Sequence, residues 1–392
     1  MGALQASSKI AVVGAGVGGL STAIALVQQG FEVQVYERAQ ALRPVGAGLT
    51  LSPNGLNSLA AIHPEMVETL KQAGSHTRIA HLKKSTGELI LSQPVRLAQQ
   101  FGQPMLNIRW SRLQEILAQV LPTDIIHLNH CCTGFKQSDT AVVVHFRNQK
   151  SIEADLLIGA DGINSMVRQT LLRDGSPRYR GRLSWRAVVP YPSKLLPPDE
   201  VTIVTAPDGK NCLWVDAGEG YLFWSVMALE HDGSLSLDPQ STKLRVLEIV
   251  SGWAEPVPTI IGNTPAHLIM ERPIFDRPPV KSWSQGRVTL LGDAAHPVVP
   301  SIGQGANMAF EDACELIYCL SQCSTLEAAF DAYETQRIPR TEVIYARSAY
   351  QGDRAYQPDS ETALRELINP SQWRQEEFDN WLYSYKPVLS KN

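Results

Sequence analysis

The sequence of 392 residues lacks several features that would assign it to a special class of protein. It has no run of about 18 apolar residues, so we expect no segment that spans a membrane. Its first residues do not combine a charged stretch with an apolar one, so we expect no secretory signal and a cytoplasmic location. The net charge is −4 and no long basic run occurs, which argues against nucleic acid as a main partner.

Cysteine is scarce, and its spacing matches no known framework. The six cysteines include no C-x-x-C pair, and no histidines stand at zinc-finger distances from them. We therefore expect reduced thiols and no metal site. The hydrophobic content of 44% and the charged content of 19% are typical of globular proteins, and the length predicts about two domains.

The most informative stretch lies at the start of the chain. A β-branched run at residues 9–13 predicts a strand, an apolar face at residues 20–27 predicts a helix, and residues 32–36 predict a second strand that stops at Glu37. Three glycines in G-x-G-x-x-G spacing stand between the first strand and the helix: Gly14, Gly16 and Gly19. This order of elements is the fingerprint of a dinucleotide-binding unit.

Each glycine has a separate task in such a unit. Gly14 permits the tight turn, Gly16 lets the backbone approach a pyrophosphate, and Gly19 lets the helix and the strand pack closely. The N-terminus of the helix then offers free N–H groups and a positive dipole end to the phosphates. Glu37 follows Gly19 at nearly the spacing expected of the acid that binds a ribose diol.

Two later stretches are candidates for contact with a nucleotide. The glycines at positions 46 and 48 indicate backbone close to something flat or bulky, or only a loop that turns near residue 53. Arg109 and Arg112 lead into an amphipathic helix, either as phosphate ligands, since arginine suits bidentate contacts, or as surface charges. We also expect a helix over residues 56–72 and a hairpin over residues 78–91.

Two further strands are each expected to end near an aspartate. Residues 155–160 lead into Asp161-Gly162, and residues 286–292 lead to Asp293. The glycine-rich loop after Asp293 leaves the start of the next helix, near Gly305 and Ala306, bare for an anion or an electron-rich ring edge. Helices are expected over 325–348 and 360–368. The aromatic tail at 373–385 either packs on the domain, covers a pocket or docks on a partner.

Residues 176–275 have a different character. Short aromatic and β-branched runs separated by Gly and Pro predict a mostly antiparallel sheet. Trp214 and Trp224 lie in these runs, as ordinary core residues or as walls of an apolar pocket. The chain is thus expected to be an α/β protein in three parts. These are a discontinuous Rossmann-type nucleotide-binding domain (1–175, with an internal hairpin segment at 78–108, and 276–350), an inserted substrate domain (176–275), and a C-terminal helical segment (351–392).

Together the motifs resemble the class A flavoprotein monooxygenases, the para-hydroxybenzoate hydroxylase family. The resemblance rests on the glycine motif with Glu37, on Asp161-Gly162, on Gly292-Asp293, and on the loop from Pro300 to Asn307. The stretch from Gly46 to Asn54 and the pair Trp185-Arg186 are more similar to the salicylate hydroxylase and zeaxanthin epoxidase branch. The resemblance runs from about residue 8 to residue 350.

The resemblance implies a Rossmann-type FAD-binding domain and a noncovalent FAD, with NADH or NADPH as a reductant that visits and leaves. Glu37 would bind the adenosine ribose, Asp293 the ribityl chain, and the N–H groups of Gly305 and Ala306 the flavin pyrimidine oxygen. In this family Asp161 touches both FAD and the reductant. The other residues expected at the cofactor are Arg38, Gly48 and one of Arg109 and Arg112, because Trp110 stands where relatives often have an arginine.

The implied activity is the insertion of one oxygen atom from O2 into an aromatic or alkene substrate by way of a flavin C4a-hydroperoxide, in a monomer or homodimer. Arg186 would orient an acidic or phenolic group unless it forms a surface salt bridge, and Pro297 and Pro300 would shape the rim beside the flavin. Trp214 and Trp224 complete the expected substrate pocket, and no side chain is a clear acid–base catalyst. The alternatives are a flavin-dependent reductase or halogenase of the same superfamily, or an FAD-binding sensor without turnover.

Overall fold

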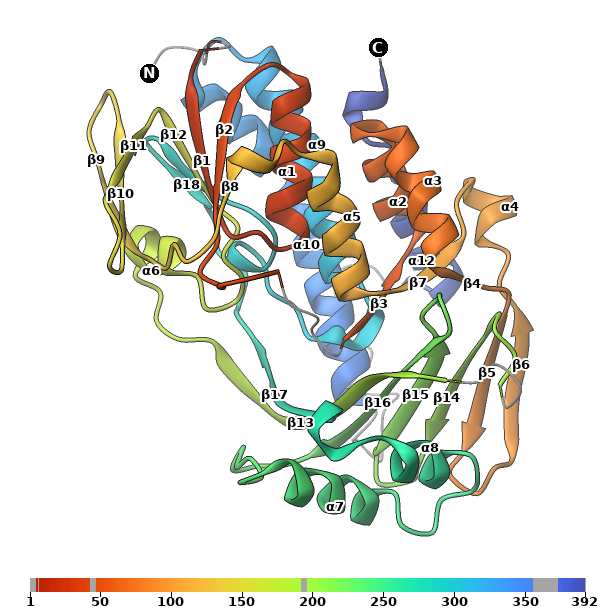
Figure 1. Cartoon of the computed structure of the whole chain (residues 1–392). Helices are drawn as coiled ribbons and strands as arrows, with labels where there is room; N and C mark the ends of the chain where they lie inside the picture. Colours follow the sequence, from red (N-terminus) through yellow and green to blue (C-terminus); the bar gives the residue numbers. More distant parts are fainter. Residues whose placement is uncertain (1–4, 6, 43–46, 192–195, 355–372, 392) are drawn as a thin grey trace.

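The computed structural model describes residues 5, 7–42, 47–191, 196–354 and 373–391 (Figure 1). Two expectations lie outside the described residues: the glycine at position 46 and the helix at 360–368. Within the described part of the chain, none of the helices is both long and apolar enough to cross a bilayer.

A six-stranded sheet forms the centre of the first domain, in the order β18-β19-β12-β1-β2-β8. Its neighbours are parallel except for β18 and β19. The strands are β1 (Lys9–Val13), β2 (Glu32–Tyr36), β8 (Ile126–His127), β12 (Leu156–Gly159), β18 (Ser284–Gln285) and β19 (Val288–Leu290). β1 and β2 have the bounds predicted from sequence, and the helix between them is α1 (Val17–Gln28).

Both faces of this sheet are covered, as the continuous apolar runs of its strands require. Figure 1 shows α1, α5 (Trp110–Val120) and α9 (Gly305–Gln322) on one side and a small sheet on the other. The small sheet consists of β9 (Cys132–Gln137), β10 (Val142–Phe146) and β11 (Ile152–Ala154). Consecutive residues of β12 are therefore buried, rather than alternating between buried and exposed.

The expected helix over 56–72 is in fact two helices, α2 (Pro53–Ile62) and α3 (Pro64–Ala73). Pro64 lacks an N–H and cannot continue α2, but it is well tolerated at the first position of α3. Pro53 starts α2 for the same reason, so residues 53 and 54 are helical rather than a loop turn. The remaining elements nearby are β3 (Gly48–Leu51), β4 (Ser75–Thr77), β7 (Met105–Arg109), α4 (Leu97–Phe101) and α6 (Met166–Leu172).

A seven-stranded sheet forms the second domain, in the order β17-β13-β16-β15-β14-β5-β6. It is antiparallel apart from the pair β14 and β5. Its strands are β5 (Ile79–Lys84), β6 (Leu89–Pro94), β13 (Arg178–Pro190), β14 (Glu200–Thr205), β15 (Asn211–Asp216), β16 (Tyr221–Leu229) and β17 (Met270–Asp276). We expected the hairpin β5–β6 to belong to the nucleotide-binding domain. In the structure it extends the sheet of the substrate domain.

Two helices, α7 (Pro239–Ile249) and α8 (Val257–Asn263), cover the face of this sheet that points away from the first domain (Figure 1). At the C-terminal end, α10 (Leu326–Arg354) packs along α9, and α12 (Gln375–Tyr383) packs on both. Arg340 of α10 donates to the Leu382 carbonyl at 2.9 Å and lies 4.5 Å from the centre of the Trp381 ring. The described part of the tail is therefore a packing element of the first domain.

Candidate active site

The opening glycine loop has the geometry of a phosphate cradle. Gly14 has φ +110°, and a Cβ there would lie 2.3 Å from the Ala160 carbonyl oxygen. A Cβ on Gly19 would lie 1.9 Å from the Gly14 oxygen, so only glycine permits this turn. A Cβ on Gly16 would meet nothing within 4 Å, and no side chain caps α1. The start of α1 is thus open to an approaching anion.

Glu37 reaches this loop from the end of β2. Its carboxylate accepts hydrogen bonds from the backbone N–H groups of Ala15 at 2.8 Å and Ala39 at 2.9 Å. Gln114 of α5 donates to the Ala15 carbonyl at 2.7 Å, which fixes the first half of α5 beside the loop. Arg38 follows Glu37 with an exposed side chain.

Asp293 and the start of α9 meet at a second open end of a helix. A Cβ on Gly305 would lie 3.7 Å from Asp293 Oδ1, and no side chain caps α9. The Asp293 side chain is exposed, yet the surrounding protein desolvates its carboxyl and raises the pKa. Because the side chain is exposed, a bound group can reach the carboxyl and form hydrogen bonds with it.

A buried polar network holds the start of α9 against β3 and α2. Asn307 accepts from the Ser52 N–H at 2.9 Å and donates to the Thr50 carbonyl at 3.1 Å. Asn54 donates to Gln304 at 2.9 Å. Sequence reasoning missed these contacts, which join residues about 250 positions apart and leave no periodic signal.

A second buried network anchors the loop that carries Asp293. Asp312 of α9 accepts from the Gly292 N–H at 3.0 Å, from His296 Nε2 at 2.5 Å, and from Arg337 Nε at 2.7 Å. Burial alone would raise the pKa of Asp312, but His296 and Arg337 lower it to about 2. Asp312 therefore stays charged and fixes the turn at Gly292.

Asp161 lies at the start of α6. Its carboxylate accepts from Ser165 Oγ and from the N–H groups of Met166 at 2.7 Å and Val167 at 3.2 Å. The Ser165 hydroxyl also accepts from the Arg168 N–H, as expected of a helix cap. Burial raises the pKa of Asp161 despite these hydrogen bonds.

Arg109 and Arg112 converge on one carboxylate that belongs to the substrate domain. Arg109 Nη2 and Arg112 Nε, the latter at 3.0 Å, donate to Glu219 in the turn between β15 and β16. Arg112 Nη1 also donates to Glu115 at 3.0 Å. Arg109 Nε is buried and makes no hydrogen bond in the described structure, so Arg109 has one carboxylate partner where Arg112 has two.

Gly48 has a flat neighbour, but that neighbour is a protein side chain. Gly48 pairs with Arg109 between β3 and β7, and a Cβ on Gly48 would lie 2.5 Å from Cγ of Phe223. Phe223 belongs to β16, so the substrate sheet touches the first domain at this point. The absence of a side chain at position 48 allows that contact.

The two faces of the substrate sheet differ. Trp185, Trp214 and Trp224 share the face under α7 and α8, where Trp224 Nε1 donates to Thr264 at 2.9 Å. Arg186 pairs with Ser225 and therefore points to the other face, the one on which Phe223 lies. We expected Trp214, Trp224 and Arg186 to line one substrate pocket. In the structure the two tryptophans and Arg186 lie on opposite faces of the sheet.

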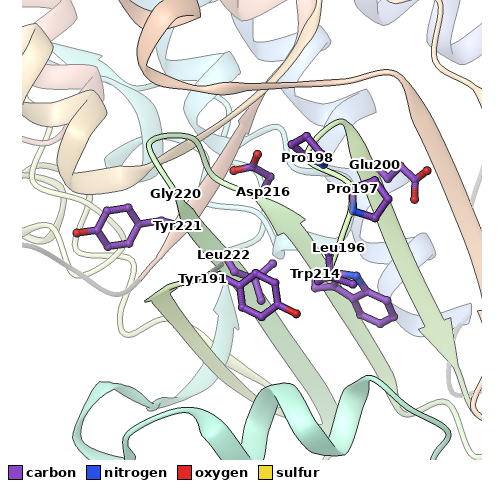
Figure 2. Close-up of a pocket in the computed structure, with 10 residues that line it drawn as sticks. All are labelled: Tyr191, Leu196, Pro197, Pro198, Glu200, Trp214, Asp216, Gly220, Tyr221 and Leu222. Atoms are coloured by element: carbon purple, nitrogen blue, oxygen red, sulfur yellow. The ribbon is translucent and has the colours of Figure 1, made fainter. Parts of the chain in front are cut away.

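Trp214 instead lines a recess at one end of β14–β16, with about 370 Å³ of space that is partly open to solvent. Figure 2 shows Tyr191, Leu196 and Trp214 gathered there, while Tyr221 points away from them. Pro297 is buried and Pro300 is exposed, on the loop that leads to α9. Among the described residues, no cluster of His, Cys, Asp and Glu has the arrangement of a metal site.

The chain is similar in sequence to a known family and to several characterised enzymes. The family model described as FAD binding domain matches residues 7–348. Aurachin C monooxygenase/isomerase of Stigmatella aurantiaca is 36% identical over 86% of this chain and 87% of its own. The 6-hydroxynicotinate 3-monooxygenase of Pseudomonas fluorescens is 32% identical over 87% of this chain and 90% of its own.

The chain belongs to this family of FAD-dependent monooxygenases. A solved structure agrees: Klebsiella pneumoniae HpxO complexed with FAD and uric acid has a TM-score of 0.86 and 26% identity, and the match covers 96% of each chain. The fold class expected from sequence is confirmed, and the cofactor of this monooxygenase is FAD.

The residues present fit FAD. The open space at Gly16 and the uncapped start of α1 suit a pyrophosphate, and Glu37 stands beside them. At the other end, Asp293 and the uncapped start of α9 suit the polar part of a flavin. Arg109, which Glu219 engages through Nη2, can add a contact to a phosphate.

Proposed function

We propose that this monooxygenase takes electrons from NADH or NADPH and inserts one oxygen atom of O2 into an aromatic ring that bears an acidic or phenolic group. The observation that supports this substrate class is the state of Arg186. Its Nε is buried without a hydrogen-bond partner. Burial, and then the nearby charge of Arg272, lower the pKa of the Arg186 guanidinium. A buried cation of this kind needs an anionic partner.

The face around Arg186 suits a flat ring. Phe223 and Val188 form a cross-strand pair beside Arg186 and Ser225, and Met270 pairs with Arg186 from β17. These side chains are half-buried, in contrast to the fully buried face under α7 and α8. A ring can therefore lie on the apolar side chains while its oxyanion binds the guanidinium. The hydroxynicotinate and urate named in two relatives are aromatic compounds with acidic groups.

On this proposal the chain binds, orients and excludes water, while bound FAD supplies the redox chemistry with O2 and the nicotinamide. The N–H groups at the start of α9 would stabilise negative charge on the flavin ring. Asp293 would hold the ribityl chain, and Glu37 the adenosine ribose. Pro297 and Pro300 would form the rim between the flavin and the substrate sheet.

Within this site we assign the arginine that contacts FAD as Arg109 rather than Arg112. Arg112 donates from Nε to Glu219 and from Nη1 to Glu115, whereas Arg109 engages Glu219 through Nη2. Arg109 thus has one carboxylate partner where Arg112 has two, so more of its donors are left for a ligand phosphate.

The experiment is a screen of NADH and NADPH oxidation with oxygen uptake, using aromatic acids and phenols and their uncharged amide or ether analogues. Arg186→Gln should raise KM for the acids at least about tenfold and leave KM for the neutral analogues within about twofold. Arg186→Lys, which keeps the charge but not the planar fork, should fall between the two. Equal effects on acids and neutral analogues would refute the role of Arg186.

A further inference from the structure

The turn between β15 and β16 carries an unusual backbone conformation at a contact between the two domains. Gly218, Glu219 and Gly220 follow one another with φ +80°, +53° and +77°. Glycine adopts such values freely, but at Glu219 the conformation is strained. A Cβ on Gly218 would lie 2.1 Å from the Ala73 carbonyl oxygen, so the turn is seated closely on the end of α3.

Because the turn packs on α3, the Glu219 carboxylate lies within hydrogen-bond distance of Arg109. Glu219 accepts from Arg109 Nη2, and the Arg109 guanidinium carbon lies 4.0 Å from the centre of the Tyr221 ring. One short hairpin end therefore holds the guanidinium from two sides, by an ion pair and by a cation–π contact. Both partners belong to the substrate domain, while Arg109 belongs to the cofactor domain.

We propose that Glu219 is a positioning residue for the cofactor, supplied by the substrate sheet: it fixes the Arg109 guanidinium through Nη2 and leaves the rest of the guanidinium to bind FAD. The proposal rests on the assignment of Arg109 above. If Glu219 instead competed with FAD for Arg109, it would occupy the donor that FAD needs. In the structure Glu219 engages Nη2 alone, and the Arg109 side chain keeps 20% of its surface exposed for another partner.

The energetic reason is preorganisation. A free arginine side chain has many rotamers, and a ligand that must order it loses part of the binding free energy. With Glu219 and Tyr221 in place, that ordering occurs when the domains pack, before FAD arrives. The substrate sheet and the cofactor site are then coupled, because movement of the β15–β16 turn would displace Arg109 and change the affinity for FAD.

The test is FAD titration of apoprotein, followed by quenching of flavin fluorescence. Glu219→Gln keeps the size and the backbone of the turn but removes the charge, and it should weaken FAD binding about five- to tenfold. Glu115→Gln is the matched control, because Glu115 pairs with Arg112 and not with Arg109. Its FAD affinity should stay within about twofold of wild type.

A double variant completes the cycle. Arg109→Gln alone should weaken FAD binding, and adding Glu219→Gln should cause little further loss, since both changes remove the same interaction. Unchanged or tighter FAD binding by Glu219→Gln would overturn the proposal while Arg109→Gln still shows a loss. If Glu219→Gln lowered the free energy of unfolding of the apoprotein by as much as it lowered the free energy of FAD binding, the contact would be merely structural. That result would also overturn the proposal. Normal FAD binding by Arg109→Gln would refute the assignment of Arg109 itself.

Discussion

Alanine substitutions at Gly16 and Gly19 should have opposite consequences, although the two residues are three positions apart in one motif. The Cβ of Gly19→Ala would lie 1.9 Å from the Gly14 carbonyl oxygen, a backbone atom that cannot swing aside. The Cβ of Gly16→Ala would meet no protein atom within 4 Å, and φ −72° suits alanine. If the loop cradles FAD, the Gly16→Ala methyl group fills the space of the pyrophosphate.

The magnitudes follow from these distances. Gly19→Ala should lower the free energy of unfolding of the apoprotein by about 3 kcal/mol or more, because helix α1 must move away from β1. Gly16→Ala should cost the apoprotein about 1 kcal/mol or less, the difference between glycine and alanine at a helix N-cap. Its FAD affinity should fall by about two orders of magnitude, since lost phosphate hydrogen bonds are worth roughly 1.5–3 kcal/mol each.

The assay is a pair of measurements on each variant: thermal unfolding of the apoprotein, and FAD binding by flavin fluorescence. The expected pattern is a stable Gly16→Ala protein that does not retain FAD and a Gly19→Ala protein that is unstable with or without it. Wild-type FAD affinity in Gly16→Ala would refute the placement of the pyrophosphate at this loop.

Three further predictions follow from the structure. Asp293→Ala should abolish retention of FAD, and a yellow, active variant would refute the role of Asp293 at the ribityl chain. The lowered pKa of Asp312 means that its ionised form stabilises the fold at pH above about 4, and that this stability is lost as the pH falls toward 2. Chemical unfolding from pH 5 to 2 should therefore show a smaller loss of unfolding free energy in Asp312→Asn than in the wild type. That variant is itself destabilised by about 1.5–3 kcal/mol, because Arg337 keeps its ion pair with Glu311 but loses the one with Asp312. Equal losses in the two proteins would contradict this. Gly48→Ala should raise KM for the substrate by displacing Phe223, and the smaller side chain of Phe223→Leu should restore part of the loss; no change of KM in Gly48→Ala would count against that contact.

The elements that sequence predicts well are those set by local signals. β1, α1 and β2 were predictable because β-branched runs, helical periodicity and the glycine motif lie within thirty residues of one another. The split between α2 and α3 at Pro64 was also local, and it was missed because the apolar pattern continues across it. The cofactor and the reaction class were implied by the family resemblance that these motifs carry.

What sequence cannot supply are partners brought together by the fold. Alternation along β13–β16 defines two faces, but only the packing of α7 and α8 shows which face holds Trp214 and Trp224. The difference between Arg109 and Arg112 depends on Glu219, more than a hundred residues away in the chain. Glycines on either side of an acidic residue, as at Glu219, are typical of a tight turn, yet nothing local indicates where that turn packs.

The most direct test of the central claim is turnover under ¹⁸O2, with the mass of the product measured. The account predicts that NADH or NADPH oxidation by the FAD-loaded enzyme yields a product of an aromatic acid or phenol that carries one ¹⁸O atom. Oxidation of the nicotinamide that gives only hydrogen peroxide with every such compound, or a product whose new oxygen comes from water, would contradict it.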